Sequence, residues 1–204
     1  MSEILVVAEL AEAGVRKATH SAIQAARKIN QLAGGTFSIL VLGGPGTKAA
    51  AAELTSFGAA QILSCEDASL ASYLAERYAP VVAAAAKGFD VIVATASTYG
   101  KDLLPRVAAR LDAAYAADCS DIASKGGQLS YKRPMFAGNA YGFCCLDGAQ
   151  QVVSVRQSEF DAAQPSGGAS PISDVPLVAP GAAAQRVQFV SLDQVKSERP
   201  ELTE

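Results

Sequence analysis

The stretch that decides the fold is "DVIVATASTYGKDLLPRVAARL", Asp90 to Leu111. Residues 90–95 are mainly apolar and β-branched, which is typical of a strand buried on both faces. After it, apolar side chains recur at helical spacing, at Leu103, Leu104, Val107, Ala108 and Leu111. We expect Pro105 to lie in the first turn of that helix, where proline is tolerated. A strand followed directly by a helix is the unit from which parallel sheets are built.

The same alternation fills the residues before this stretch. Apolar runs predict strands at 4–8, 36–42 and 60–65. Helical spacing predicts helices at 16–33, 47–57 and 68–87, the last one kinked at Pro80. The buried face of the first helix should carry Ala18, Ala22, Ala25, Ile29 and Leu32. We therefore expect an α/β fold with a doubly wound, mainly parallel sheet.

The second half of the chain has a different pattern. Strand-like runs at 127–133, 140–146 and 150–156 follow one another without helical segments between them, which predicts an antiparallel addition or an edge to the main sheet. Residues 162–184 are rich in Pro, Gly, Ser and Ala and are expected to form a long surface loop, before a last short strand at 186–192. We predict a single α/β domain over residues 1–190 and a charged linker or tail over 191–204.

Composition excludes several classes of function. Aromatic residues make up 6% of the 204 residues, Trp is absent and the net charge is −3, so neither nucleic acid nor an anionic membrane is an expected partner. No apolar run is as long as a membrane span and the N-terminus lacks the basic region of a signal peptide, so we expect a cytoplasmic protein. The four cysteines lack C-x-x-C spacing, and no metal site is predicted.

A glycine-rich turn resembles a dinucleotide-binding motif. The pattern G-x-G-x-x-A is formed by Gly44, Gly46 and Ala49, between a predicted strand and a predicted helix. Glu66 and Asp67 follow at about the distance expected of a ribose-binding carboxylate. However, the motif follows the second strand, and Pro45 removes an N–H from the loop that should bind a phosphate. A tight turn between strand and helix is therefore the favoured interpretation.

The sequence offers little for catalysis. The only histidine, His20, lies within a helical pattern without a G-x-S-x-G nucleophile turn, and a solvent-facing position on the helix is expected. No carboxylates are paired in a recognisable acid–base arrangement. We therefore predict no catalytic residues.

The segment after the fourth strand is the best candidate for binding an anion. It offers hydroxyl groups and cations where a central strand ends and a helix begins: Thr95, Ser97, Thr98, Lys101 and Arg106. The alternative is structural, with Thr98 or Asp102 capping the helix while Lys101 and Arg106 are solvated. The residues alone leave the two interpretations open.

Several stretches together resemble the alpha subunit of electron transfer flavoprotein. "YGKDLLPRVAARLDAA", followed by "CSDI", then "KRPMFAGNAYGF", "SVRQSEFDAA" and "ERPELTE" occur in the order found in that family, and the resemblance covers essentially the whole chain. It implies an adenine-nucleotide-hydrolase-like, Rossmann-like N-terminal domain. It also implies a partner, the beta subunit, which holds AMP at the segment equivalent to Thr95–Arg106, whereas the alpha subunit is not expected to bind a nucleotide there.

The resemblance also implies that the complete alpha subunit carries electrons on FAD. In the family, the flavin comes from a C-terminal domain that opens, after "RPEL", with a glycine-rich "SGGRG" loop. That loop is absent from this sequence, so we expect the N-terminal domain, ending at the interdomain linker, without stable FAD binding of its own.

The predicted function is accordingly that of an electron carrier's structural part and not of an enzyme. The alpha/beta heterodimer would carry electrons from acyl-CoA and related dehydrogenases to a downstream acceptor. Within it, residues 99–121 and the hairpin at 133–141 are the segments expected to face the beta subunit. The alternative is a free-standing AMP- or ATP-binding module of the same fold, with the nucleotide over 44–48 or 95–101.

Overall fold

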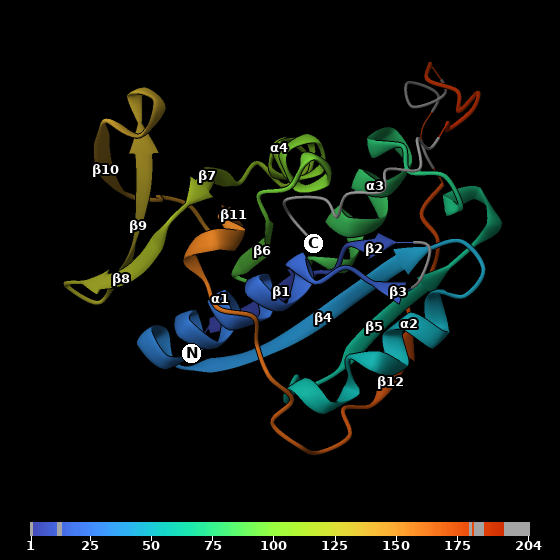
Figure 1. Cartoon of the computed structure of the whole chain (residues 1–204), viewed down its shortest axis with the longest axis horizontal. Helices are drawn as coiled ribbons and strands as arrows, with labels where there is room; N and C mark the ends of the chain where they lie inside the picture. The colour runs from blue at the N-terminus through green and yellow to red at the C-terminus, as the bar shows by residue number, and fades with distance from the viewer. Residues whose placement is uncertain (1, 12–13, 180, 182–185, 194–204) are drawn as a thin grey trace, which may run out of the picture.

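The computed structural model describes residues 2–11, 14–179, 181 and 186–193, and its main element is a seven-stranded sheet (Figure 1). The strand order is β12-β5-β4-β1-β6-β11-β7, and every neighbouring pair is parallel. The strands are β1 (Ser2–Val7), β4 (Gly35–Gly43), β5 (Ile62–Glu66), β6 (Val91–Thr95), β7 (Ala114–Cys119), β11 (Gln151–Val155) and β12 (Ile172–Asp174). The predicted α/β class and parallel sheet are confirmed.

Helices cover both faces of this sheet (Figure 1). α1 (Ala18–Ala33) and α2 (Thr47–Glu53) pack on one face, and α3 (Ala75–Ala85) and α4 (Thr98–Leu111) pack on the other. Along β1, Ile4 and Val6 belong to the first core, while Leu5 and Val7 belong to the second. Because successive side chains of a strand point to opposite faces, a continuous apolar run fills both cores. The fold is therefore doubly wound.

A small antiparallel sheet projects from the β7 end of the molecule (Figure 1). It contains β8 (Asp121–Lys125), β9 (Gln128–Met135) and β10 (Ala140–Cys145), as the predicted antiparallel addition requires. Tyr131 of β9 is fully buried, and its hydroxyl donates to Gln151 Oε1 at 2.6 Å, which joins this sheet to the main one. The remaining elements are a two-stranded sheet, β2 (Leu10–Ala11) and β3 (Gly14–Val15), and short 3₁₀ turns at Thr55–Phe57, Ala68–Leu70, Phe136–Gly138 and Gln157–Glu159.

The prediction for residues 150–156 was wrong in its placement. β11 is parallel and lies inside the main sheet between β6 and β7. The connection from β7 to β11 is made by the three-stranded sheet instead of a helix, so the usual sign of a parallel strand is missing. The buried run of Val152, Val153 and Val155 is the local signal of a central strand.

Two predictions for the C-terminal part also need correction. The expected loop at 162–184 contains β12, which pairs with β5 at the edge of the main sheet. The strand expected at 186–192 is not formed, and its apolar side chains at Val187, Phe189, Val190 and Leu192 are exposed. The domain limits 1–190 and 191–204 stay a prediction, because residues 194–204 lie outside the described part of the chain.

The helix predictions were right in place but wrong in detail. The segment 68–87 is broken before α3, and the break places Tyr73 against Tyr78 and Tyr99, with ring centroids 5.0 Å and 4.7 Å away. Pro105 lies inside α4, past its first turn, on the exposed side where water can reach the carbonyl that Pro105 leaves unbonded. Leu32 of α1 is exposed. None of the helices in the described ranges is long and apolar enough to cross a membrane.

The contact between α4 and β6 leads to a first prediction. A Cβ at Gly100 would lie 1.9 Å from the carbonyl oxygen of Thr95, a backbone atom that cannot turn aside. Gly100→Ala should therefore lower the free energy of unfolding by about 2 kcal/mol, although alanine favours helix formation by about 1 kcal/mol. Urea denaturation measures the sign directly. A variant as stable as the wild type, or more so, would show that α4 does not pack so closely on Thr95.

Candidate functional site

The candidate site is the point where the order of the parallel strands reverses. From β1 the chain builds outward through β4 and β5, and it then returns to the other side of β1 with β6. In doubly wound sheets, ligands bind beyond the carboxyl ends of the two strands at this point. Glu9 follows β1 and Ser97 follows β6, so these two residues stand at the entrance of the expected crevice.

A hydrogen bond between these two residues joins the two strand ends, and we call this bridged position the closed crevice. The Ser97 hydroxyl donates to Glu9 Oε2 at 2.6 Å and accepts from the Gly100 N–H at 3.1 Å. Glu9 is only 7% exposed and forms an ion pair with Arg16 at 3.5 Å. The carboxylate thus lies at the positive end of α4, where the phosphate of a bound nucleotide would otherwise be stabilised.

Backbone contacts hold Glu9 in this position. The N–H of Glu9 donates to Thr19 Oγ1 at 2.9 Å, and the same hydroxyl donates to the Glu9 carbonyl oxygen at 3.2 Å. The Thr95 hydroxyl donates to the Ala18 carbonyl oxygen at 2.6 Å. The start of α1 is therefore bonded to the ends of both strands, and the Thr95 hydroxyl is used within the chain.

A cluster of tyrosine rings adjoins Glu9 on the α3–α4 side. Tyr99 packs against Tyr73 and Tyr78, and burial raises the pKa of Tyr99, which the nearby Glu9 carboxylate raises further. Burial likewise raises the pKa of Tyr78 to about 12. These phenols remain protonated at neutral pH, and the Tyr73 hydroxyl donates to Asp102 at 3.0 Å.

The five residues predicted to bind an anion do not converge on one point. Thr95 and Ser97 are bonded as described above, while Thr98 and Lys101 are exposed at the start of α4. Arg106 is exposed farther along α4 and pairs with Asp102 at 3.4 Å. A role of these residues in binding stays a prediction. The predicted cap was wrong, because neither Thr98 nor Asp102 caps α4. The helix already begins at Thr98, and Ser97, the residue before it, is the cap.

The glycine-rich turn at 44–48 is also occupied by a carboxylate of the chain. The N–H of Lys48 donates to Glu66 Oε2 at 3.0 Å, and Lys48 Nζ bonds Asp174 at 2.8 Å. A Cβ at Gly44 would lie 2.7 Å from the Cα of Ala71, so this glycine allows close packing of the chain. Glu66, the residue that the motif would assign to a ribose, instead binds the start of α2.

The lone histidine has a structural environment. His20 lies in α1, where it is half-buried, and its ring meets that of Phe57 edge-on, with centroids 4.9 Å apart. It is therefore less exposed than predicted. Within the described ranges, no three His, Cys, Asp or Glu side chains come together as a metal site would require.

A second polar cluster lies where β7 and β11 end. Arg156 makes a two-pronged ion pair with Asp118, at 2.5 Å and 3.2 Å. The hydrogen bond from Arg156 holds the pKa of Asp118 below its usual range. Asp118 has a left-handed backbone, with φ of 55°, and its N–H donates to Ser154 Oγ at 2.9 Å. No sequence signal marks Asp118, because the cluster depends on the bulge where β7 pairs with β11.

Next to this cluster, large apolar side chains are exposed on the β9–β10 hairpin. Met135, Phe136, Tyr141 and Phe143 are 47%, 77%, 50% and 69% exposed. We call these four residues together the hairpin face; Tyr141 and Phe143 point to one side of the ribbon, and Met135, which packs beside Gly142, points to the other. Arg133 anchors the hairpin to β7 by donating to the Ala117 carbonyl oxygen at 2.6 Å, and Lys132 Nζ lies 4.1 Å from the centre of the Tyr141 ring. The hairpin turn is strained, since Phe136 has φ of 49°.

Comparisons with known proteins agree on one family. A family model described as "Electron transfer flavoprotein domain" matches residues 4–180. The chain is 35% identical over 200 residues to an electron transfer flavoprotein subunit alpha of Pseudomonas aeruginosa, which covers 98% of this chain and 62% of that protein. It is 33% identical to the Paracoccus denitrificans subunit alpha (92% and 57% covered). It is 32% identical to a probable mitochondrial subunit alpha of Caenorhabditis elegans (99% and 58% covered). The chain therefore spans about three fifths of these relatives.

The hydrogen bond to Glu9 predicts that the adjacent residues Ser97 and Thr98 contribute differently to the free energy of unfolding. Ser97→Ala removes both the cap of α4 and the donor to Glu9, so the free energy of unfolding should fall by about 1–2 kcal/mol. Thr98→Ala, the matched control, removes an exposed hydroxyl and should change it by less than about 0.5 kcal/mol. Thermal and urea unfolding measure both. Equal effects, or a larger effect at Thr98, would contradict the assigned geometry.

The Asp118–Arg156 pair predicts a pH dependence. A carboxyl group with a lowered pKa stabilises the fold above its unfolded pKa, near 3.9, and this stabilisation is lost as the pH falls through the lowered value. Asp118→Asn keeps a residue that tolerates a left-handed backbone but removes the charge. The wild type should therefore be more stable than the variant at pH 7, and the difference should shrink toward about pH 3. Urea titrations at pH 7 and at about pH 3 measure this difference in stability. The same difference at both pH values would contradict the ion pair between Asp118 and Arg156.

Proposed function

The chain belongs to the electron transfer flavoprotein family, and from this premise we propose that it is the N-terminal domain of an alpha subunit that docks the beta subunit. In this proposal the domain is a structural part of an electron carrier and has no catalytic site of its own. The observation that carries it is the pairing of a closed crevice with an exposed apolar hairpin face. The first removes the usual ligand site of the fold, and the second supplies a surface for a protein partner.

The described residues do not fit a flavin. The two helix ends where its phosphates would be expected are occupied by glutamate carboxylates, Glu9 at α4 and Glu66 at α2. A bound phosphate would have to displace a carboxylate at either place, against like-charge repulsion. We therefore assign no step of electron transfer to these residues, and propose that the FAD of the complete alpha subunit is held elsewhere.

The hairpin face has the composition of a protein interface. Exposed aromatic side chains are enriched at the centres of interfaces, and arginine is the most frequent charged residue there. The hydrogen bond to Asp118 is the main cause that raises the pKa of Arg156, and the Tyr141 phenol adds a small further contribution. The apolar face and the Arg156–Asp118 pair thus adjoin each other, as an apolar centre and a polar rim would.

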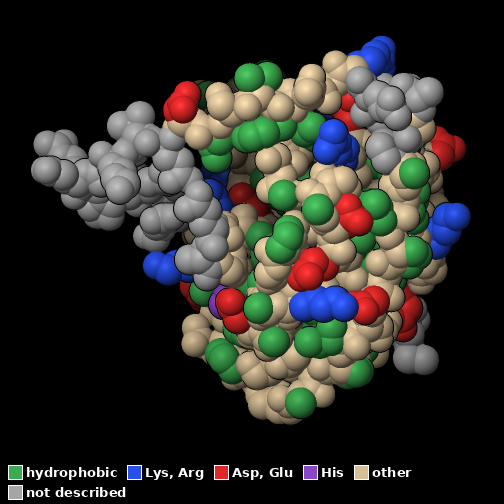
Figure 2. Space-filling view, turned by 90° about the vertical axis from the view of Figure 1, so that its right-hand side faces the viewer, with side chains coloured by type: hydrophobic (Ala, Val, Ile, Leu, Met, Phe, Trp, Pro, Cys, Tyr) green, Lys and Arg blue, Asp and Glu red, His purple; other side chains and the backbone are tan. Residues whose placement is uncertain are grey.

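The opposite end of the molecule looks different. Figure 2 shows a surface on which acidic and basic side chains are interspersed with apolar ones, as on a solvated surface. Of the two segments predicted to face the partner, the hairpin at 133–141 has the stronger support. The other, 99–121, contributes its last residues, near Asp118, while α4 packs its apolar side chains against the main sheet.

The larger assembly follows as part of the same proposal. The heterodimer would carry electrons on FAD from acyl-CoA and related dehydrogenases to a downstream acceptor, with AMP in the beta subunit. A cytoplasmic location is proposed for this chain, although the Caenorhabditis elegans relative is named as mitochondrial. The alternative, a free-standing AMP or ATP module, has less support because carboxylates occupy both expected phosphate positions.

A substitution at Phe136 should weaken binding of the beta subunit without destabilising the fold. The Phe136 side chain is 77% exposed and its backbone is left-handed, a conformation that asparagine adopts more readily. Phe136→Asn should leave the fold as stable as the wild type, or more stable by up to about 1 kcal/mol. The same variant should weaken binding of the beta subunit about tenfold or more, because it removes an aromatic anchor.

Isothermal titration of the chain with the beta subunit from the same organism measures that affinity, and urea denaturation measures stability. Ile172→Ser, an exposed apolar residue on β12 at the far edge of the sheet, is the matched control and should not change the affinity. Equal affinity for wild type and Phe136→Asn would overturn the assignment of the hairpin face as the docking surface.

A further inference from the structure

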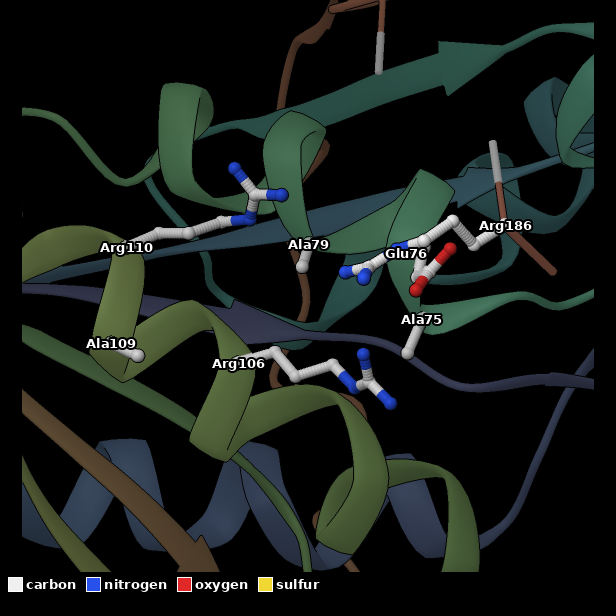
Figure 3. Close-up of a pocket in the computed structure, with 7 residues that line it drawn as sticks. All are labelled: Ala75, Glu76, Ala79, Arg106, Ala109, Arg110 and Arg186. Carbon is white, nitrogen blue, oxygen red and sulfur yellow. The ribbon is translucent and has the colours of Figure 1, made fainter. Parts of the chain in front are cut away.

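A small cavity between α3 and α4 lies away from the hairpin face and the closed crevice. Its volume is about 310 Å³, which is at the lower end of the range for small-molecule sites. Figure 3 shows the side chains that line it, from both helices and from the C-terminal segment of the described chain. They are Ala75, Glu76, Ala79, Arg106, Ala109, Arg110 and Arg186.

Arginines give the cavity a positive wall. Arg106 and Arg110 leave successive turns of α4 on the side that faces α3, and Arg186 extends into the same space (Figure 3). Arg106 bonds Asp102 through Nε, which leaves its terminal nitrogens for another acceptor. Arg110 forms no ion pair or hydrogen bond with any side chain in the described ranges. Guanidinium groups that line one cavity favour an anion within it.

Glu76 supplies an independent observation. Glu76 lines this cavity, and its Oε2 atom is buried without a hydrogen-bond partner among the described residues. A buried carboxylate oxygen without a partner is costly, so structures rarely keep one without a reason. A small turn of the Glu76 side chain into the cavity would let this oxygen accept a hydrogen bond from a ligand hydroxyl group.

The small side chains of the wall make room for such a ligand. Ala75 and Ala79 lie on one helix and Ala109 on the other, so the two helices leave space between the charged groups. An arginine can bind both oxygens of a carboxylate, whereas two arginines on successive turns suit a group with three free oxygens. The arrangement therefore favours a phosphate over a carboxylate.

We propose that this cavity binds a small phosphorylated polyol, with the phosphate between Arg106 and Arg110 and a hydroxyl group donating to Glu76. Two groups of opposite charge then recognise two ends of one ligand. The site lies on α3 and α4, away from the β9–β10 hairpin, so the proposal goes beyond docking of the beta subunit and can fail independently of it.

The experiment is a titration of the whole chain followed by ¹H–¹⁵N NMR, with ribose 5-phosphate, inorganic phosphate and ribose as separate probes. Ribose 5-phosphate should shift the amides of α3 and α4 saturably at millimolar concentration, inorganic phosphate should bind there more weakly, and ribose should leave them unchanged. Arg110→Gln removes one guanidinium from an exposed position and should weaken ribose 5-phosphate binding about tenfold. Lys125→Gln, on the distant β8, makes the same charge change and should have no effect.

Glu76→Gln gives effects of opposite sign. It should weaken ribose 5-phosphate, which loses a charged acceptor, and strengthen inorganic phosphate, which is no longer repelled by the carboxylate. The proposal is overturned if no probe shifts the α3–α4 amides, or if Arg110→Gln and Lys125→Gln behave alike. It is also overturned if Glu76→Gln changes both phosphates in the same direction. Binding of the beta subunit by Arg110→Gln should equal that of the wild type, which keeps this test separate from the docking proposal.

Discussion

The hydrogen bond from Ser97 to Glu9 is the contact on which the arrangement of α1 and α4 around the centre of the sheet depends. It joins the residues that follow β1 and β6, the two strands at which the sheet reverses its order. The same serine caps α4, and the backbone of Glu9 is bonded to Thr19 at the start of α1. One helix from each face of the sheet is thereby fixed to the centre of the sheet, at the place where this fold ordinarily opens to a ligand.

A common principle connects the two glycine- and hydroxyl-rich segments of the chain. Glu9 at α4 and Glu66 at α2 place a carboxylate where a helix end favours a negative charge. In the proposed function the helix ends are satisfied without a nucleotide, and the segments that resemble phosphate-binding loops are structural turns. With its internal sites occupied, the domain has its most distinctive chemistry on its surface, at the hairpin face and in the α3–α4 cavity.

The sequence predicts the parts of this structure that depend on neighbouring residues. Continuous apolar runs identified β1, β4 and β6, and helical spacing located α1 and α4. It could not place β11, because a small antiparallel sheet replaces the helix that normally precedes a parallel strand. It could not identify the partner of Ser97 either, since Glu9 is 88 residues away and its role is set by the meeting of two strand ends. Arg106 was singled out as a cation, but only the packing of α3 beside α4 shows which side chains share its surroundings.

The central claim is that this domain acts through a protein surface and keeps the centre of its sheet closed. Hydrogen–deuterium exchange of the chain, alone and with the beta subunit and AMP, tests it most directly. We expect slower exchange of the hairpin amides, residues 131–143, in the complex, while the amides of residues 96–101 exchange as slowly without AMP as with it. Protection of 96–101 that appears only with the nucleotide, together with an unchanged hairpin, would contradict the account and favour a nucleotide-binding module.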